Sequence, residues 1–309
     1  MSKKTSIGGQ ALMEGIMMVG PMKKVAAFCD KNGNITTEEI VCPALKDKYP
    51  ILGKPFIRGI FSMAHSLNMG MKAMERSADK AMEGEEVTES KFDKWLTEKM
   101  GNNMSKIITA VGSVLGVLLA VVLFMFLPSL ITNGIKALAG EGIEPFRSLI
   151  EGGVRMIIFL IYILLISLMP DIKRVFMYHG AEHKTIFCYE AELPLTVENV
   201  RKQSRFHPRC GTSFMILIIL IGVIVGFLIP FSDPLVRTLM KIVTLPVVIS
   251  VGYELIKFCG RHDGILCKII SYPGLLVQRI TTKEPDDKMI ETAIAAMNEV
   301  IPENGEDII

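Results

Sequence analysis

The chain has 309 residues, a net charge of +2 and a mean hydropathy of +0.40, and half of its residues are hydrophobic. This hydropathy excludes an ordinary soluble globular protein and indicates a membrane protein. The small net charge gives no reason to expect a nucleic-acid partner, because the positions of the basic residues are explained by membrane topology.

The first part of the chain, residues 1–104, is predicted to form a small α+β cytoplasmic domain. Asn32-Gly33 lies between apolar runs and is typical of a β-hairpin turn, so we expect a small sheet here. A helical pattern of apolar residues then extends from Pro55 to about Met82. This Met-rich amphipathic helix is expected either on the membrane surface or packed against other helices.

The remainder of this predicted domain connects it to the membrane. Residues 83–91 are acidic and polar and are expected to be a linker. Residues 92–101 are expected to form a short helix that leads into the first span.

Residues 105–258 are predicted to form a membrane domain of about four transmembrane helices. The predicted spans are 107–131, 154–169, 212–231 and 239–256. The fourth is the weakest, because it contains Lys241 and Glu254. The predicted fold class is therefore a mainly α membrane protein with a small α+β N-terminal domain.

The distribution of lysine and arginine predicts the orientation in the membrane. The loop at 171–211 is rich in basic residues, whereas the two shorter connections are not, so this loop is expected on the cytoplasmic side. Four spans would then place both termini in the cytoplasm of a multi-pass protein of the inner cell membrane. All six cysteines lie outside the outer connections, so they are expected to be free thiols.

The chain after the last span, residues 259–309, is predicted to be a cytoplasmic C-terminal segment. Apolar residues recur at helical spacing from Pro285 to about Val300, which predicts an amphipathic helix. Residues 303–309 are expected to be disordered.

The sharpest chemical signal lies in the basic loop, on a helix predicted from Pro170 to about Glu192. His179 and His183 are four residues apart and share one helix face, with Glu182 beside them. This order, H-x-x-E-H, is the inverted form of a zinc-protease motif, in which the histidines bind metal and the glutamate activates water.

A second short motif, His207-Pro208-Arg209-Cys210, precedes the third span. With His179 and His183, the side chains of His207 and Cys210 would complete a tetrahedral zinc site of structural type. Cys210 also lies at the N-terminal end of the third predicted span, and this end of a helix favours the thiolate form of a cysteine. If Cys210 is not a ligand, three ligands and a water remain, which suits catalysis with Glu182 as general base. Glu190 is the alternative third ligand.

Two further carboxylates are weaker candidates. Glu254 lies in the fourth span and should face a protein interior, where it either pairs with Arg155 or lies at the cytoplasmic interface beside Lys257. The interfacial position is favoured. Glu14 lies in a Gly-rich apolar stretch and is a candidate site residue, although a solvated loop carboxylate is favoured.

Five motifs extend the interpretation, namely GGQALMEGIMMVGP at 8–21, YHGAEHKTIFCYE at 178–190, HPRCGTSF at 207–214, YELIKF at 253–258 and TTKEPDD at 281–287. They resemble the YqhQ-like family of uncharacterised bacterial integral membrane proteins, over nearly the whole chain. The resemblance implies a predicted metal-dependent enzyme without an established substrate. Its signature would include Glu14, His179, Glu182, His183, His207, Arg209 and Cys210.

Three functions are therefore considered. The first is a hydrolase that depends on zinc or another divalent metal, with its site at the cytoplasmic face. The second is a non-enzymatic accessory or regulatory factor with a structural zinc. Transport ranks last, because matching broken-helix signals are absent from the two halves. The expected partners are the lipid bilayer and either a membrane protein or a second copy of the chain.

Overall fold

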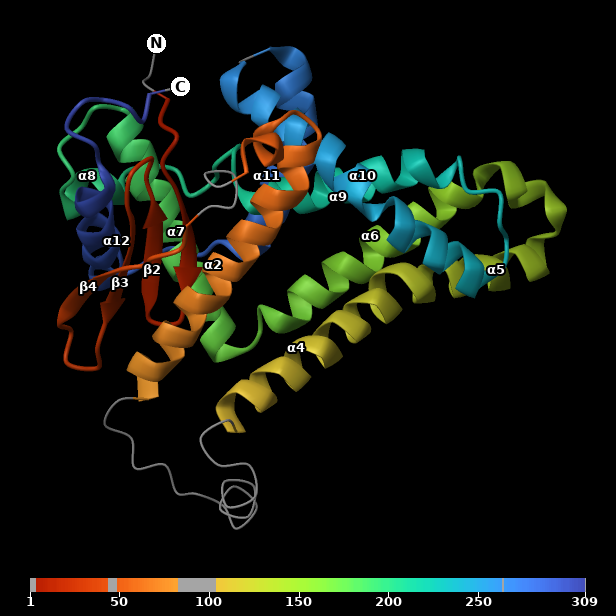
Figure 1. Ribbon diagram of the computed structural model, residues 1–309, viewed down its shortest axis with the longest axis horizontal. Coiled ribbons are helices and arrows are strands. Elements are labelled where there is room, and N and C mark those ends of the chain that lie inside the picture. Colours follow the sequence, from red (N-terminus) through yellow and green to blue (C-terminus); the bar gives the residue numbers. More distant parts are fainter. Residues whose placement is uncertain (1–3, 44–48, 83–103, 263, 309) are drawn as a thin grey trace. The chain divides into compact units, whose positions relative to one another are not determined.

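The structure is a computed structural model that describes residues 4–43, 49–82, 104–262 and 264–308 (Figure 1). The chain divides into two compact units. The first contains Met1–Ala81, Leu160–Ile221 and Leu245–Ile309, and the second contains Met82–Phe159 and Gly222–Thr244. The N-terminal sheet thus shares its unit with later helices. The predicted linker at 83–91 and the predicted helix at 92–101 lie outside the described residues.

The first unit contains a four-stranded antiparallel sheet with the strand order β1-β2-β3-β4. The strands are β1 (Gly8–Leu12), β2 (Gly15–Val19), β3 (Lys24–Cys29) and β4 (Ile35–Glu39). The predicted Asn-Gly hairpin is confirmed between β3 and β4. There the Asp30 carboxylate accepts hydrogen bonds from the backbone N–H groups of Asn32 and Asn34, both at 2.8 Å, and Gly33 has a φ of +83°.

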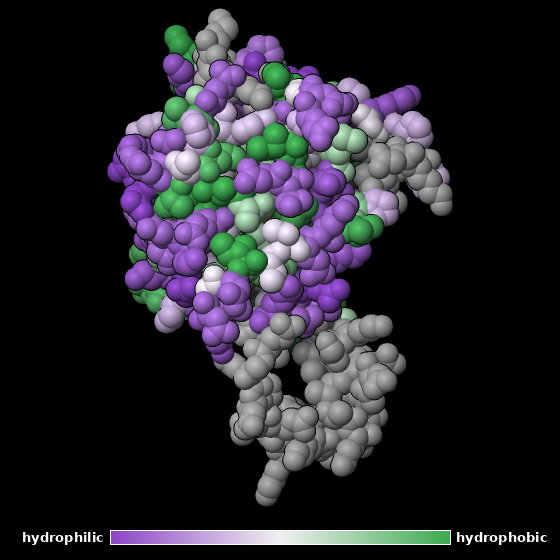
Figure 2. Space-filling model, turned by 90° about the vertical axis from the view of Figure 1, so that its left-hand side faces the viewer, coloured by the Kyte–Doolittle hydropathy of each residue, from purple (hydrophilic) through white to green (hydrophobic). Residues whose placement is uncertain are grey.

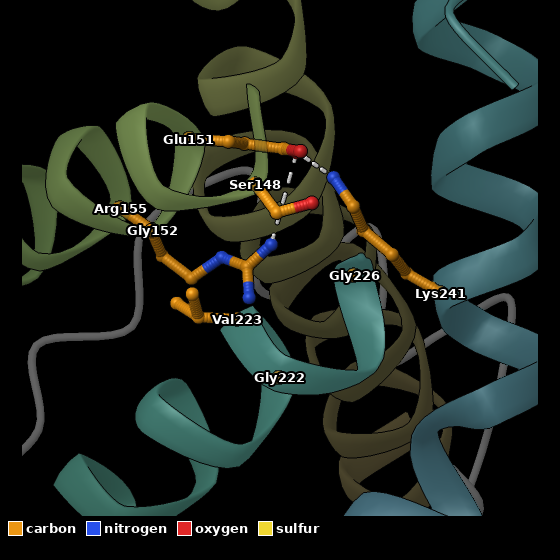
Figure 3. Close-up of a pocket in the computed structure, with 8 residues that line it drawn as sticks. All are labelled: Ser148, Glu151, Gly152, Arg155, Gly222, Val223, Gly226 and Lys241. Atoms are coloured by element: carbon orange, nitrogen blue, oxygen red, sulfur yellow. Dashed lines mark ion pairs between the residues drawn. The ribbon is translucent and has the colours of Figure 1, made fainter. Parts of the chain in front are cut away.

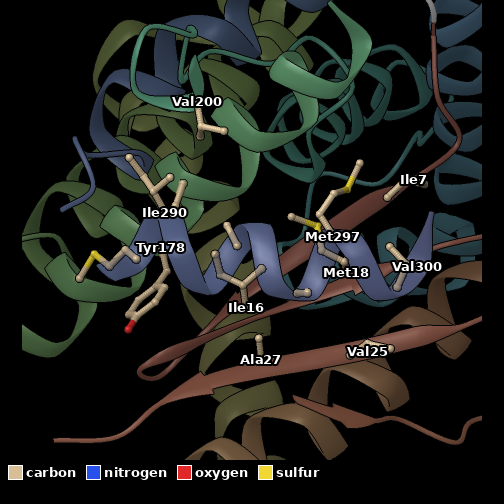
Figure 4. Close-up of a cluster of buried hydrophobic side chains, with 14 of the residues drawn as sticks. Ile7, Ile16, Met18, Val25, Ala27, Tyr178, Val200, Ile290, Met297 and Val300 are labelled. Carbon is tan, nitrogen blue, oxygen red and sulfur yellow. The ribbon is translucent and has the colours of Figure 1, made fainter. Parts of the chain in front are cut away.

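Both faces of the sheet are covered. In β2, Ile16 and Met18 point to one face and Met17 to the other, because successive side chains of a strand alternate. The first face packs against α7 (Pro170–Glu190) and α12 (Asp287–Val300) (Figure 4). The second packs against Met69 and Ala73 of α2 (Ile57–Met82). Burial on both faces explains why β2 and β3 are continuously apolar.

The predicted helices at 55–82, 170–192 and 285–300 are confirmed as α2, α7 and α12. The Met-rich helix α2 therefore packs on the sheet in its central part. Its N-terminal residues Phe56 and Ile57 remain exposed. Figure 2 shows the side of the molecule where β4, α12 and α8 (Val197–Arg201) are labelled in Figure 1, and hydrophilic side chains dominate this surface.

Three helical segments in the described part of the chain are long and apolar enough to cross a membrane. They are Ala110–Ala139, Glu141–Ile166 and Pro234–Arg261. The first is built from α4 (Met104–Val121), the π-helix η3 (Val122–Phe126) and α5 (Leu127–Ala139). The second joins the 3-10 helix η4 (Glu141–Phe146) to α6 (Arg147–Ile166), and the third is α10 (Pro234–Arg261). Apolar side chains such as Leu118, Leu165 and Val243 are exposed along them, as expected for contact with lipid.

The predicted span at 212–231 is shorter than expected. Its helix α9 ends after only 16 residues, at Gly211–Gly226, and falls below the length of the other three. The guanidinium of Arg237 takes the backbone carbonyls of Gly226, Ile229 and Phe231 as hydrogen-bond acceptors. These bonds satisfy the carbonyl groups at and beyond the end of the helix, so the chain can leave the helix there.

Three further elements were not predicted from the sequence. They are the 3-10 helices η1 (Pro50–Gly53) and η4 (Glu141–Phe146) and the helix α11 (Ile265–Thr281). The last described residues also differ from the expected disorder. Asp307 is buried and accepts hydrogen bonds from the Thr5 hydroxyl at 2.6 Å and the Tyr189 hydroxyl at 3.0 Å.

Candidate metal centre

The helix α7 places His179 and His183 side by side in the first unit. Pro170 begins this helix at a position where its missing N–H costs nothing, and Asp171 follows in the first turn. Because the two histidines are four residues apart, their rings lie on one face, with centroids 4.4 Å apart. The predicted pairing of these two imidazoles is therefore present.

Each imidazole is held by a backbone carbonyl. His179 Nδ1 lies 2.9 Å from the carbonyl oxygen of Thr281, and His183 Nδ1 lies 2.6 Å from that of Arg205. A carbonyl can only accept, so Nδ1 of both rings must carry a proton, and Nε2 is the nitrogen through which either ring could bind a metal. Metal-binding histidines are oriented in this way by hydrogen bonds from the ring nitrogen that does not bind the metal.

Cys210 completes a group of three. Its sulfur lies 3.2 Å from His179 Nε2 and accepts a hydrogen bond of 3.3 Å from the Thr212 hydroxyl. The ligand atoms of His179, His183 and Cys210 all lie within 4.8 Å of one another. Two ligands of a tetrahedral zinc ion are about 3.3 to 3.6 Å apart, given the usual Zn–N and Zn–S lengths. The donor set and its spacing therefore fit zinc after small side-chain shifts.

Glu182 is buried beside this group but is not part of it. A β-carbon at Gly9 of β1 would lie 2.9 Å from the side-chain carbons Cγ and Cδ of Glu182. Burial raises the pKa of Glu182, while His179 and the Gly9 N–H oppose that shift. The Gly-rich N-terminal motif thus covers the carboxylate of the H-x-x-E-H helix.

His207 lies next to the group, in a different set of contacts. Its ring centroid is 5.5 Å from that of His183 and 4.6 Å from that of Phe187. Its Nε2 lies 3.8 Å from a carboxylate oxygen of Glu190. Burial lowers the pKa of His207 to about 4, against the opposing effect of Glu190, so the ring is neutral at pH 7. The structure therefore brings His207 close to the three ligand atoms without including it.

Glu190 and Arg209 form an anchor for the N-terminal segment. The carboxylate of Glu190 pairs with the Arg209 guanidinium and accepts a hydrogen bond of 2.9 Å from the Thr5 N–H. Arg209 donates in turn to the Thr5 carbonyl at 3.1 Å. Burial would raise the pKa of Glu190, but His207, the Thr5 N–H and Arg209 together hold it below its usual value. The structure does not bring Glu190 into the group of three ligands.

Glu14 is held away from the histidines by an ion pair. It lies in the turn between β1 and β2 and binds the Arg174 guanidinium through both carboxylate oxygens. The Tyr178 hydroxyl lies 3.4 Å from one of these oxygens. Arg174 is five residues before His179, and Glu14 therefore tethers the β1–β2 turn to an earlier part of α7.

Glu254 has a partner that the sequence did not indicate. Its two oxygens accept hydrogen bonds from Arg58 Nε at 2.8 Å and Arg58 Nη2 at 2.5 Å, so the pair is bidentate. The suggested pairing with Arg155 is wrong, because Arg155 lies 3.9 Å from Glu151 instead. The favoured position at the cytoplasmic interface beside Lys257 stays a prediction. The pair with Arg58 links α10 to the start of α2.

Several residues that support the centre were missed in the sequence. Gln278 of α11 is fully buried and makes two reciprocal hydrogen bonds with the backbone of His207, at 2.7 and 2.8 Å. Lys184 is also buried and donates to the carbonyls of Arg201 and Gln203, both at 3.0 Å. Two of the family motifs carried a signal. Lys184 lies within the motif at 178–190, and Thr281, the first residue of the motif at 281–287, supplies the carbonyl for His179.

Comparison with known proteins identifies the family. A family model described as "Protein of unknown function (DUF1385)" matches residues 54–303. The chain is 35% identical over 307 residues to a Bacillus subtilis (strain 168) protein described as "Uncharacterized protein YqhQ", and the alignment covers 95% of this chain and 92% of that protein. No solved structure matches the chain. The chain belongs to the DUF1385 family, and the predicted YqhQ-like family membership is confirmed.

Proposed function

We propose that the protein is a membrane metalloenzyme that binds one zinc ion through His179, His183 and Cys210. The observation that carries this proposal is the fixed tautomer of both histidines. Their Nδ1 atoms are bonded to backbone carbonyls, which leaves both Nε2 lone pairs for a metal beside the Cys210 sulfur. Nitrogen and sulfur donors favour zinc over magnesium or calcium.

The number of ligands supports a catalytic centre. Three protein ligands leave one tetrahedral position for water or substrate, as in zinc hydrolases. The bound metal would supply an activated water and polarise the bond to be cleaved. Glu182 is the nearest candidate for a general base, because it is next to His183 on α7 and its burial raises its pKa, which makes the carboxylate a better proton acceptor.

Membrane location and sidedness belong to the same proposal. Three apolar helices support a membrane protein, and the basic residues of the 171–211 loop support a cytoplasmic position for the centre and for both termini. Substrates of suitable class are a lipid head group, a membrane peptide, or a small phosphorylated or amide compound.

A second function is favoured by one specific observation, the burial of two of the three candidate ligands. His183 is only 1% exposed and Cys210 only 9%. A closed site is typical of a structural zinc, which would hold the central loop, α9 and the segment after α11 together in a non-enzymatic accessory or regulatory protein. His207 would then be the fourth ligand after a rotation of its side chain.

Zinc content of the detergent-purified protein tests the metal site. We expect about one zinc per chain in the wild type and a loss of most of it in His183→Ala and Cys210→Ala. His262→Ala is the matched control, because His262 is exposed, stacks on Phe258 and does not belong to the group of possible ligands found among the described residues. A folded wild-type protein without zinc would contradict the proposal, and the cluster would then be a hydrogen-bonded network.

Glu182→Gln separates the two functions. For an enzyme we expect this variant to keep its zinc and to hydrolyse a substrate of the proposed classes at least about 100-fold more slowly than the wild type. For a structural zinc, removal of the metal by a chelator should unfold the central loop, and Glu182→Gln should leave every functional readout unchanged.

A further inference from the structure

The second unit contains a cluster of charged side chains inside its apolar helices. Glu151 of α6 pairs with Arg237 of α10 at 2.8 Å and with Lys241 one turn further along α10. Arg155, one turn after Glu151, lies 3.9 Å from the same carboxylate. The four side chains are buried, with exposed fractions between 2% and 13%.

The cluster carries an excess of positive charge. Among the described residues, Glu151 is the only carboxylate within ion-pair distance of these three cations. The next carboxylate, Glu144, is already paired with Lys136 and Arg147. Two positive charges therefore lack a counter-charge in an apolar environment, where an uncompensated charge is costly.

The three cations differ in how well they are satisfied. Arg237 donates to Glu151, to the Ser148 hydroxyl and to three backbone carbonyls. Arg155, in contrast, has only the long ion pair with Glu151, and its Nε has no hydrogen-bond acceptor among the described residues. Arg155 is thus the cation with an unused hydrogen-bond donor that could bind an anion.

A small cavity lies at this point, as Figure 3 shows. It has a volume of about 10 Å³ and is lined by Ser148, Glu151, Arg155 and Lys241, together with the glycines at 152, 222 and 226 and Val223. This volume holds one sphere of the size of a water molecule. A phosphate group is too large for it, whereas a monatomic halide is little larger than water.

We propose that this cavity binds one small inorganic anion of the size of chloride, between Arg155 and Lys241. The anion would accept the free guanidinium N–H of Arg155 and compensate part of the excess charge, which a neutral water cannot do. The glycines leave the space for it, since a β-carbon at position 222 would lie 3.2 Å from Arg155 Nη1.

A wider hollow of about 530 Å³ also lies on the second unit. Its lining includes Lys136 and Arg147 together with the carboxylates of Glu141 and Asp233, and Lys136 is paired with Glu141 and Glu144. Arg147 is adjacent in sequence to Ser148, which lines the small cavity.

The test is the dependence of thermal unfolding on the anion. The detergent-purified full chain is melted in sodium chloride, sodium bromide and sodium gluconate at equal ionic strength. We expect chloride and bromide to raise the melting temperature by roughly 5 °C in a saturable manner, and gluconate, which is too large, to have no such effect. Radioactive chloride should bind at about one ion per chain and be displaced by bromide.

Variants locate the site. Arg155→Gln should abolish the halide-dependent shift, whereas Lys136→Gln, which changes a half-buried residue of the wider hollow, should retain it. Equal melting in all three salts, or a shift that never saturates, would overturn the proposal, and so would a full shift in Arg155→Gln. The binding measurement on the wild type decides the question even if Arg155→Gln does not fold.

Discussion

Gly180 lies directly against the main chain at Lys283, so that a β-carbon at position 180 would overlap the Lys283 carbonyl oxygen. The N–H of Lys283 donates to the Phe176 carbonyl at 2.8 Å, which fixes this contact between α7 and the segment after α11. Thr281, two residues earlier, provides the carbonyl that orients His179. The glycine in H-G-A-E-H therefore serves the centre by allowing the close approach of this segment.

Substitution of Gly180 should therefore damage both stability and metal binding. In Gly180→Ala the main chain at Lys283 must move, which costs about 3 kcal/mol, while the better helix propensity of alanine returns about 1 kcal/mol. We expect a net loss of about 2 kcal/mol in chemical denaturation and a weaker affinity for zinc. Gly153→Ala is the control, because a β-carbon there meets no atom within 4 Å. Equal stability of the two variants would show that the contact is unimportant.

The hydrogen bonds between Gln278 and His207 make a second prediction. Gln278→Leu keeps the volume of the side chain but leaves the buried N–H of His207 without its acceptor, while the His207 carbonyl keeps the Cys210 N–H at 3.3 Å. An unsatisfied buried group costs about 1–3 kcal/mol, so we expect a loss of about 1–3 kcal/mol in the free energy of unfolding. Denaturant unfolding monitored by circular dichroism measures this loss in the free energy of unfolding.

A conservative variant separates the two bonds. Gln278→Glu retains one acceptor for the His207 N–H and should fall between the wild type and Gln278→Leu. If Gln278→Leu is as stable as the wild type, the hydrogen bonds between Gln278 and the backbone of His207 do not contribute to stability.

A third prediction is that Glu14, in the N-terminal motif, does not bind the metal. Glu14→Gln removes the charge that pairs with Arg174. Both side chains are between one third and one half exposed, so the loss of stability should be below about 1 kcal/mol. The zinc content should remain that of the wild type. A loss of zinc in a stable Glu14→Gln protein would show that this carboxylate reaches the metal.

The regular elements of the fold were largely predictable from the sequence because each has a local cause. The turn at Asn32-Gly33 and the start of α7 at Pro170 depend on single residues with strong backbone preferences. The spacing of His179 and His183 likewise guarantees a shared helix face. Local patterns of this kind need no knowledge of the tertiary structure.

The predictions that failed concern the length of α9 and the partners of individual side chains, because contacts with segments distant in the sequence determine them. Arg237 satisfies the end of α9 from another helix, and so shortens a segment that is apolar enough to span a membrane. Arg58 is nearly 200 residues from Glu254, and Gln278 is 71 residues from His207. Nothing in the composition of either segment specifies such a pair, so the support of the centre could not be derived from spacing.

The thiolate of Cys210 can be tested by replacing zinc with cobalt. If Cys210 is a ligand, the cobalt-loaded wild type should show a thiolate-to-metal charge-transfer band in the near ultraviolet, because cobalt occupies zinc sites and reports on sulfur ligands spectroscopically. Cys210→Ser should lose this band and bind the metal at least 10-fold more weakly, since a neutral hydroxyl is a poorer donor than a thiolate. Cys29→Ser is the control, because Cys29 lies at the end of β3, where its sulfur contacts the Asp30 carbonyl. A band that persists in Cys210→Ser but disappears in Cys29→Ser would place the metal at another site. The absence of any such band in the cobalt-loaded wild type would show that the two histidines bind the metal without a sulfur ligand.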